Sequence, residues 1–413
     1  MATRAIAVRK NDALWLTLLL ALFVIINYVD RGAIGIAAPK LREDLALNHE
    51  QFGLAVSAFA WIYAPAQFFI GWLTSRICVY RLVAGGLALW ALATFVTGFV
   101  GGLAALVTMR FLLGIGEGVA FPCASKIIGE HVPAHRRGLA NSALAFALGF
   151  GPALGTFAGG LILASLGWRP IFWIFGVLTL LWLIPWQGVS KPHWKTTDHA
   201  KSEMPISFWR LTRKRAAWTM GVAHFANTYG FYFLLAWLPL YLIENRGFSI
   251  LEMTSITTSV YLVQAGFAPF WGWISDRLVV QGYREATVRR SFVILYQVAI
   301  AASIVTAGLA ETRTLLIAAL ICAGAFGGIG GLSSYAISQM FAGKSAGAWV
   351  GVVNGIGNTS GIVGPLLTGW IIQTAGGNFL AAFLFTGAVC FAGALWWLFV
   401  IPPIEPDPEL HPA

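Results

Sequence analysis

Twelve long apolar runs follow one another along the chain, separated by short polar segments. Each run is close to the roughly 20 residues that an α-helix needs to cross the hydrocarbon of a bilayer. Their limits are 13–38, 51–74, 79–99, 102–127, 138–164, 168–187, 216–243, 253–275, 290–310, 313–341, 346–373 and 378–401. The pattern therefore predicts an all-α membrane protein with twelve transmembrane helices.

The most polar stretch, residues 188–215, separates six of these runs from the other six. Short motifs recur across it: GWLTSR at 71–76 returns as GWISDR at 272–277, and GPALG at 151–155 is echoed by GPLLTG at 364–369. Both motifs keep the same place in the two halves, as a duplication would give. We therefore predict two pseudo-symmetric halves. The expected boundaries are an N-terminal six-helix half at 1–187, a cytoplasmic linker at 188–215, a C-terminal six-helix half at 216–401 and a cytoplasmic tail at 402–413.

Charged residues make up 11% of the chain and hydrophobic residues 58%, a composition that excludes an ordinary soluble domain. The net charge of +10 would suggest a nucleic-acid partner, but its distribution argues against one. If the N-terminus is cytoplasmic, most basic side chains fall in cytoplasmic loops, as the positive-inside rule requires. These residues include Arg76, Arg81, Arg136, Arg137, Lys191, Lys195, Lys201, Arg210, Arg213, Lys214, Arg215, Arg277, Arg284, Arg289, Arg290 and Lys344. We therefore expect an integral membrane protein with both termini in the cytoplasm and no nucleic-acid partner. A bacterial inner membrane is its expected location.

Four charged residues lie inside the predicted spans: Asp30 and Arg31 in the first, and Arg110 and Glu117 in the fourth. A charge near the bilayer centre costs from about 3 to more than 10 kcal/mol, so such residues are expected to pair or to line a wet pathway. Asp30 and Arg110 both lie about 12 Å below the outer ends of their spans, which predicts an ion pair between them. Two acids and two bases indicate a site that handles protons and an anion. The alternative is a buried ion-pair network that only holds the two helices together.

The chemistry of these four residues suggests distinct roles. The guanidinium fork of Arg31 suits a substrate carboxylate. Glu117, in an apolar stretch, is the candidate to carry a proton near neutral pH. Asp30 is a second proton site, coupled to Arg110, and its protonation would release Arg110 from the expected pair.

Further polar residues in the spans are candidate substrate contacts. Tyr28 and Tyr63 each combine an apolar ring with a hydroxyl, which suits a ligand in a wet cavity. The C-terminal half offers Tyr229, Tyr232, Ser333, Ser334, Tyr335, Asn354 and Asn358, with Gln264 as a further polar side chain. Asn354 and Asn358 are spaced so that one helix face presents both amides. For all of these, packing or hydrogen bonding between helices is the competing interpretation.

Several other classes of function find no support in the sequence. The cysteines Cys78, Cys123, Cys322 and Cys390 have neither metal-ligand spacing nor a disulfide pattern. No phosphate-binding loop is present, so transport driven by ATP is not expected. No nucleophile–base arrangement stands out either. We therefore expect neither an enzyme nor a bound metal or cofactor, with the proton as the only coupling ion.

Motifs in several spans resemble those of the major facilitator superfamily, and within it the anion:cation symporter family. The first span carries N-Y-x-D-R at 27–31, and the second carries G-x3-S-x-F-x3-Y-x3-Q-x3-G from Gly53 to Gly71. The fourth carries R-F-x2-G-x2-E from Arg110 to Glu117. The resemblance implies proton-coupled symport of a small organic anion by alternating access. It points to a sugar acid such as a hexonate or hexuronate, or another carboxylate, and to a monomer in the bilayer. It also implies the roles given above for the four charged residues.

The sequence departs from the superfamily pattern in the loop after the second span. That loop usually reads G-x-L-x-D-R-x-G, and its Asp helps to latch a cytoplasmic gate; here Ser75 replaces the Asp and Cys78 replaces the second Gly. Arg76 remains, and the copy in the C-terminal half keeps Asp276 and Arg277. We expect Arg76, Asp276 and Arg277 to act in gating.

The fifth span keeps alternatives open. It carries Gly151-Pro152-x-x-Gly155, part of a motif associated with drug/proton antiporters, although Thr156 replaces the final Gly. A drug/proton antiporter is therefore one alternative. A proton-independent anion facilitator or exchanger is a second, and a membrane sensor without transport is a third.

Overall fold

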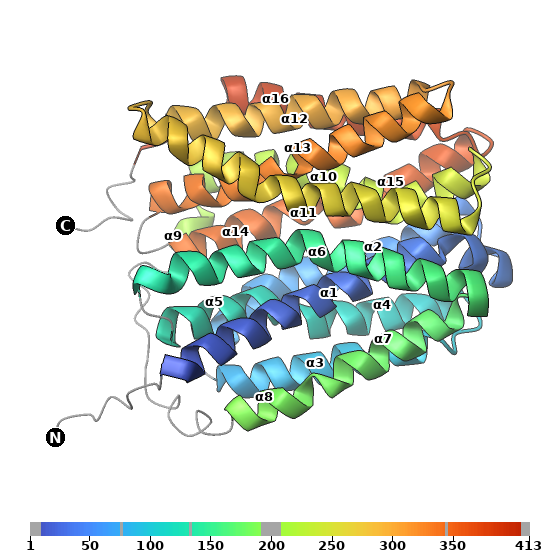
Figure 1. Cartoon of the computed structure of the whole chain (residues 1–413), viewed down its shortest axis with the longest axis horizontal. Helices are drawn as coiled ribbons and strands as arrows, with labels where there is room; N and C mark the ends of the chain where they lie inside the picture. The colour runs from blue at the N-terminus through green and yellow to red at the C-terminus, as the bar shows by residue number, and fades with distance from the viewer. Residues whose placement is uncertain (1–9, 75–76, 132–133, 191–207, 343–345, 406–413) are drawn as a thin grey trace.

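The computed structural model describes residues 10–74, 77–131, 134–190, 208–342 and 346–405, and all regular structure in these ranges is helical (Figure 1). The helices are α1 (Lys10–Asp44), α2 (His49–Leu73), α3 (Val79–Thr97), α4 (Leu103–Glu117), α5 (Ala120–His131), α6 (Ala134–Leu166), α7 (Arg169–Leu181), α8 (Leu183–Ser190), α9 (Phe208–Thr212), α10 (Arg215–Glu244), α11 (Ile250–Val280), α12 (Glu285–Leu309), α13 (Arg313–Ala342), α14 (Ala346–Gly357), α15 (Ser360–Thr374) and α16 (Leu380–Phe399). The all-α prediction is confirmed.

The helices match the twelve predicted spans in order. Most spans are single helices, and three are pairs that continue one another: α4 with α5, α7 with α8, and α14 with α15. Within the described ranges, nine segments are long and apolar enough to cross a bilayer by length and composition alone. The short helix α9 falls in the predicted linker. Residues 191–207 of that linker, and most of the predicted tail, lie outside the described residues.

Proline explains two of the three paired helices. Pro122 in α5 and Pro185 in α8 have no amide hydrogen to donate to the carbonyls four residues earlier, at Gly118 and Leu181. Those carbonyls lie where α4 and α7 end. The sequence pattern predicted continuous spans there because hydropathy does not register a local break in the helical ladder.

The helices form two groups that lie side by side (Figure 1). In the first group α1 packs on α6, while α3 packs on α4 and α7; in the second, α12 packs on α13 and α16. The groups meet where α2 packs on α15, α6 on α11, and α1 on α10. The central helices α1 and α10 therefore carry residues that face both groups, and the charged centre on α1 lies near this junction.

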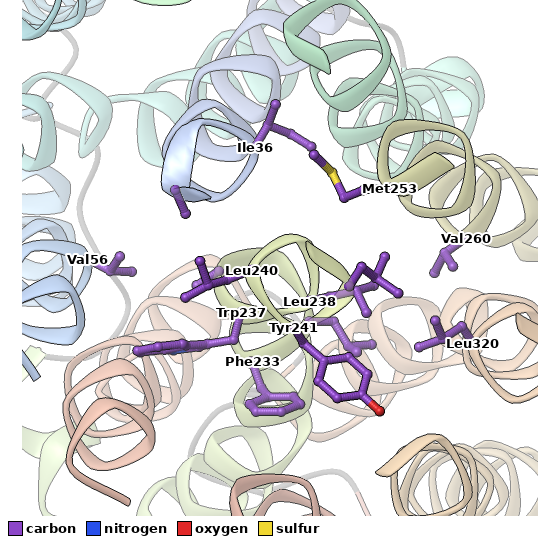
Figure 2. Packing of buried hydrophobic residues seen from close by; sticks show 14 of the residues in the cluster. Ile36, Val56, Phe233, Trp237, Leu238, Leu240, Tyr241, Met253, Val260 and Leu320 are labelled. Carbon is purple, nitrogen blue, oxygen red and sulfur yellow. The ribbon is translucent and has the colours of Figure 1, made fainter. Parts of the chain in front are cut away.

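Apolar side chains close the junction at the end of the bundle where α1 meets α2, opposite the start of α1 (Figure 1). We call this the distal end. Phe233, Trp237 and Tyr241 of α10 are buried there in one core with Ile36 of α1 and Val56 of α2 (Figure 2). Large aromatic side chains that are densely packed in this way stabilise the contact between the two groups. In this state the two groups of helices are therefore sealed together at the distal end.

A polar cluster covers this seal, and we call Arg42, His49 and Glu244 the distal latch. One carboxylate oxygen of Glu244 accepts a hydrogen bond from Arg42 Nη1, and the other lies 3.0 Å from His49 Nε2. The backbone N–H of His49 also donates to Gln373 Oε1 at 3.3 Å. The latch joins α1 and α2 to α10, and the Gln373 contact joins α2 to α15, so opening the distal end requires these contacts to break.

Close helix contact at the junction predicts a clear difference between two glycines. A Cβ on Gly53 of α2 would clash with the carbonyl oxygen of Pro365 on α15, whereas a Cβ on Gly85 of α3 would meet nothing within 4 Å. Overpacking of this kind costs about 1–3 kcal/mol. We expect Gly53→Ala to lower the thermal unfolding midpoint of the purified protein, and Gly85→Ala to leave it unchanged or raise it slightly. Equal midpoints for the two variants would contradict the contact.

Candidate functional site

The four charged residues of the spans converge at the centre of the first helix group. Helix α1 supplies Asp30 and Arg31, and α4 supplies Arg110 and Glu117; all four are at most 5% exposed. Arg31 Nε donates a hydrogen bond of 2.6 Å to Glu117 Oε2, which makes a buried ion pair between α1 and α4. Such a pair compensates two charges that would be very costly alone.

The predicted ion pair between Asp30 and Arg110 is wrong for this state. Asp30 Oδ2 instead accepts hydrogen bonds from Trp90 Nε1 on α3 and from Thr179 Oγ1 on α7, the latter at 3.1 Å. The charge of Arg110 still acts on Asp30 and Glu117, but Arg110 Nε has no hydrogen-bond partner among the described residues. Counting residues along the spans gives the position of Asp30 along its helix but not the direction in which its side chain points. Its direction differs because neighbouring residues on a helix are turned by about 100°, and Asp30 faces α3 and α7 while Arg31 faces α4.

Aromatic rings surround the guanidinium of Arg31. Its Cζ lies 4.8 Å from the ring centre of Tyr28, 5.0 Å from that of Phe59 and 4.4 Å from that of Tyr63. Phe59 and Tyr63 stack on each other with ring centres 4.9 Å apart. Arg110 also lies over Phe59, with its Cζ 5.2 Å from the ring centre. Rings at these distances attract a cation through their faces without neutralising its charge. Arg31 Nη2 has no hydrogen-bond partner within the described part of the chain.

A polar contact made by Tyr232 connects this centre to the second helix group. Tyr232 of α10 lies close enough to Arg31 for the two side chains to interact, and its hydroxyl donates to Asn358 Oδ1 at 2.9 Å. Asn358 follows the end of α14, and its Nδ2 donates to the backbone carbonyl of Asn354 at 2.9 Å. Predicted residues from both halves, Arg31, Tyr232 and Asn358, are thereby brought together at the break between α14 and α15.

Other predicted residues lie elsewhere. The ring of Tyr229 packs between α15 and α16, near Gly364 and Phe385, and not beside Arg31. The hydroxyl of Ser334 donates to the carbonyl of Gly330 on its own helix at 2.9 Å. The side chains of Ser333 and Tyr335 lie outside the described residues, and so does Arg76.

The expected gate residues of the second group, Asp276 and Arg277, lie at the end of α11. Asp276 accepts a hydrogen bond of 2.6 Å from Arg289, which also donates to Ser275 Oγ at 2.8 Å. The guanidinium of Arg277 lies over Trp273, with its Cζ 5.2 Å from the ring centre. Asp276 and Arg277, although adjacent in sequence, therefore interact with different partners.

Sequence reasoning missed three residues of the centre. Trp90 and Thr179 hold Asp30, and the buried amide of Asn27 lies beside Glu117. Trp and Thr are ordinary residues in an apolar span, so neither stands out in the sequence. The only available signal was general: a buried indole N–H needs an acceptor, and Asp30 is a strong one.

The central pair permits a test of the purely structural alternative. Replacing one partner of a buried ion pair is expected to cost about 3–5 kcal/mol, whereas replacing both by apolar residues is often neutral or stabilising. We expect Arg31→Met alone to lower the thermal midpoint strongly, and Arg31→Met combined with Glu117→Leu to recover most of it. A double variant as unstable as the single one would indicate that the pair exists to hold α1 and α4 together.

Comparisons with known proteins agree with the architecture. A family model described as Major Facilitator Superfamily matches residues 20–279 and 220–413. The chain is 29% identical to the "Probable sulfoacetate transporter SauU" of Cupriavidus necator, with 94% of each chain covered. It is 28% identical to the "Probable galactarate/D-glucarate transporter GudP" of Bacillus subtilis, over 96% of this chain and 94% of that one. Among solved structures, a bacterial homolog of the human lysosomal transporter Spinster in an inward-facing and occupied conformation superposes with a TM-score of 0.74 at 18% identity, covering 94% of this chain and 97% of the other. The predicted plan of twelve membrane helices in two pseudo-symmetric halves is confirmed.

Proposed function

Because the chain belongs to the major facilitator superfamily of membrane transporters, we propose that it carries a small organic anion across the membrane together with protons, by alternating access. The observation that supports this most is the buried pair of Arg31 and Glu117, caged by aromatic rings at the junction of the helix groups. A guanidinium suits a carboxylate or sulfonate, and a carboxyl group that competes for the same guanidinium can couple binding to protonation. The names of the relatives SauU and GudP, which refer to organic acids, support an anionic substrate.

Charge balance suggests the order of events. Asp30, Arg31, Arg110 and Glu117 together carry no net charge when both acids are ionised. A proton on Glu117 removes the charge that holds Arg31, and the guanidinium can then bind the substrate anion. A proton on Asp30 removes a second negative charge that acts on Arg110. The positive charge of Arg110 is then less compensated, which further favours binding of an anion. Loss of the protons restores the Arg31–Glu117 pair and expels the substrate.

The membrane potential makes coupling useful. An anion that enters against an inside-negative potential costs about 2.3 kcal/mol per charge per 100 mV, and each co-transported proton offsets one charge. We expect a sugar acid such as a hexonate or hexuronate, or another small carboxylate, as the substrate. One chain with its two halves is expected to be a complete carrier, working as a monomer in the bilayer with both termini in the cytoplasm.

Contacts between the halves give the proposal a route for coupling. Tyr232 of the second group interacts with Arg31 of the first and donates a hydrogen bond to Asn358, so an anion on Arg31 would alter contacts of both groups. The distal seal and latch are closed in this state. Alternating access would require the halves to rock until that end opens and the opposite end closes.

Transport in liposomes tests the proposal. The purified protein is reconstituted with a pH-sensitive dye inside the vesicles, and glucarate, galactarate, sulfoacetate and aromatic carboxylates are added outside in turn. We expect internal acidification with one class of anion, and loss of that acidification in Glu117→Gln, because the amide cannot exchange a proton. Glu43→Gln is the matched control, since Glu43 is exposed and, within the described ranges, forms its ion pair with Lys40 three residues away.

Other outcomes would contradict symport. Uphill anion uptake that persists in Glu117→Gln, without acidification, would indicate an exchanger or facilitator. Movement of lipophilic cations driven by a proton gradient, with no response to any anion, would indicate a drug/proton antiporter.

A further inference from the structure

The carboxylate of Asp30 has two very different oxygens. Oδ2 accepts hydrogen bonds from Trp90 Nε1 and from Thr179 Oγ1. Oδ1 is equally buried and has no hydrogen-bond partner among the described residues. The charges that face Asp30 come from α4, where Arg110 and Glu117 lie, while its two donors come from α3 and α7.

The donor from α3 is held firmly in place. Trp90 is fully buried, and its ring lies 5.3 Å from the ring of Phe23. A Cβ on Gly116 would lie 2.6 Å from the backbone nitrogen and the Cβ of Trp90, so α3 and α4 touch at this point. Gly116 immediately precedes Glu117. The same contact therefore fixes the donor to Asp30 and the helix position of the second acid.

We propose that Trp90 and Thr179 are positioning residues that set the proton affinity of Asp30 and confine its exchangeable proton to Oδ1. This inference rests on the proposed function, in which Asp30 is a proton site. Hydrogen bonds to a carboxylate favour its ionised form. An indole N–H can only donate, so Trp90 cannot receive a proton from Asp30 and keeps Oδ2 as an acceptor.

The hydrogen bonds from Trp90 and Thr179 also explain why Asp30 forms no hydrogen bond with Arg110. Two directional donors on the α3 and α7 side hold the carboxylate there, so the charge of Arg110 influences Asp30 through space and not through a hydrogen bond. Two of the groups that act on the proton affinity of Asp30, Trp90 and Thr179, are then neutral and take no part in the proposed anion binding. In such an arrangement the proton site can be adjusted without disturbing Arg31.

The pH dependence of uptake separates this role from a structural one. We expect Trp90→Phe and Thr179→Val each to shift the alkaline limb of the uptake–pH profile to higher pH by about one unit, a tenfold change in proton affinity, because each removes one hydrogen bond to the ionised carboxylate. Thr179→Ser keeps the hydroxyl and should keep the wild-type profile.

Trp182→Phe is the matched control for Trp90→Phe. Trp182 is also buried beside Phe23, with ring centres 5.1 Å apart, but its indole N–H donates to the carbonyl of Leu19 at 3.2 Å. The Trp182→Phe variant should therefore lose an equivalent indole donor without any shift of the uptake–pH profile.

The outcomes distinguish the inference from the proposed function. Unshifted profiles in Trp90→Phe and Thr179→Val, or an equal shift in Trp182→Phe, would overturn the inference and leave proton-coupled uptake standing. Should Trp90→Phe fail to fold, the comparison of Thr179→Val with Thr179→Ser decides the question alone. Wild-type uptake that does not depend on pH would instead overturn the proposed function.

Discussion

The compensation of buried charge at the centre of the first helix group is the constraint on which the rest of the structure depends. Arg31 and Glu117 form an ion pair with almost no exposure, and Asp30 and Arg110 lie within reach of their charges. Isolated, each of these groups would be very costly at this depth. Hydrogen bonds from Trp90 and Thr179 and the rings around Arg31 complete the compensation. A centre balanced in this way changes its charge whenever a proton or an anion enters, which is what a coupled carrier needs.

The fold places that centre where a charge change can affect both halves. Close helix contacts at the distal end join the two groups through α2 with α15 and through α1 with α10. Tyr232 brings a side chain of the second group to Arg31 and is itself hydrogen-bonded to Asn358. Because each group is packed densely within itself, a rocking motion of one group against the other requires less rearrangement than repacking inside either one. The distal latch adds polar contacts that must break during such a motion.

Hydropathy and spacing were sufficient for the architecture and for the identity of the central charges. Long apolar runs determine where helices form, and Asp30, Arg31, Arg110 and Glu117 stood out because charges in such runs are rare. The pairing of these charges could not be predicted in the same way. Depth along a helix follows from counting residues, but the direction of a side chain around the helix depends on how α1 is rotated against α3, α4 and α7. For the same reason Trp90 and Thr179 escaped notice, and Tyr229 was expected near a site from which its ring is turned away.

The competition between Glu117 and the substrate anion for Arg31 is the central claim, and proton uptake on binding tests it most directly. Calorimetric titration of the purified protein with its substrate, in buffers of different ionisation enthalpy, measures how many protons are bound with each anion. We expect net proton uptake of about one or more per anion in the wild type at neutral pH, and about one fewer in Glu117→Gln with binding retained. Anion binding to the wild type without any proton uptake would contradict it.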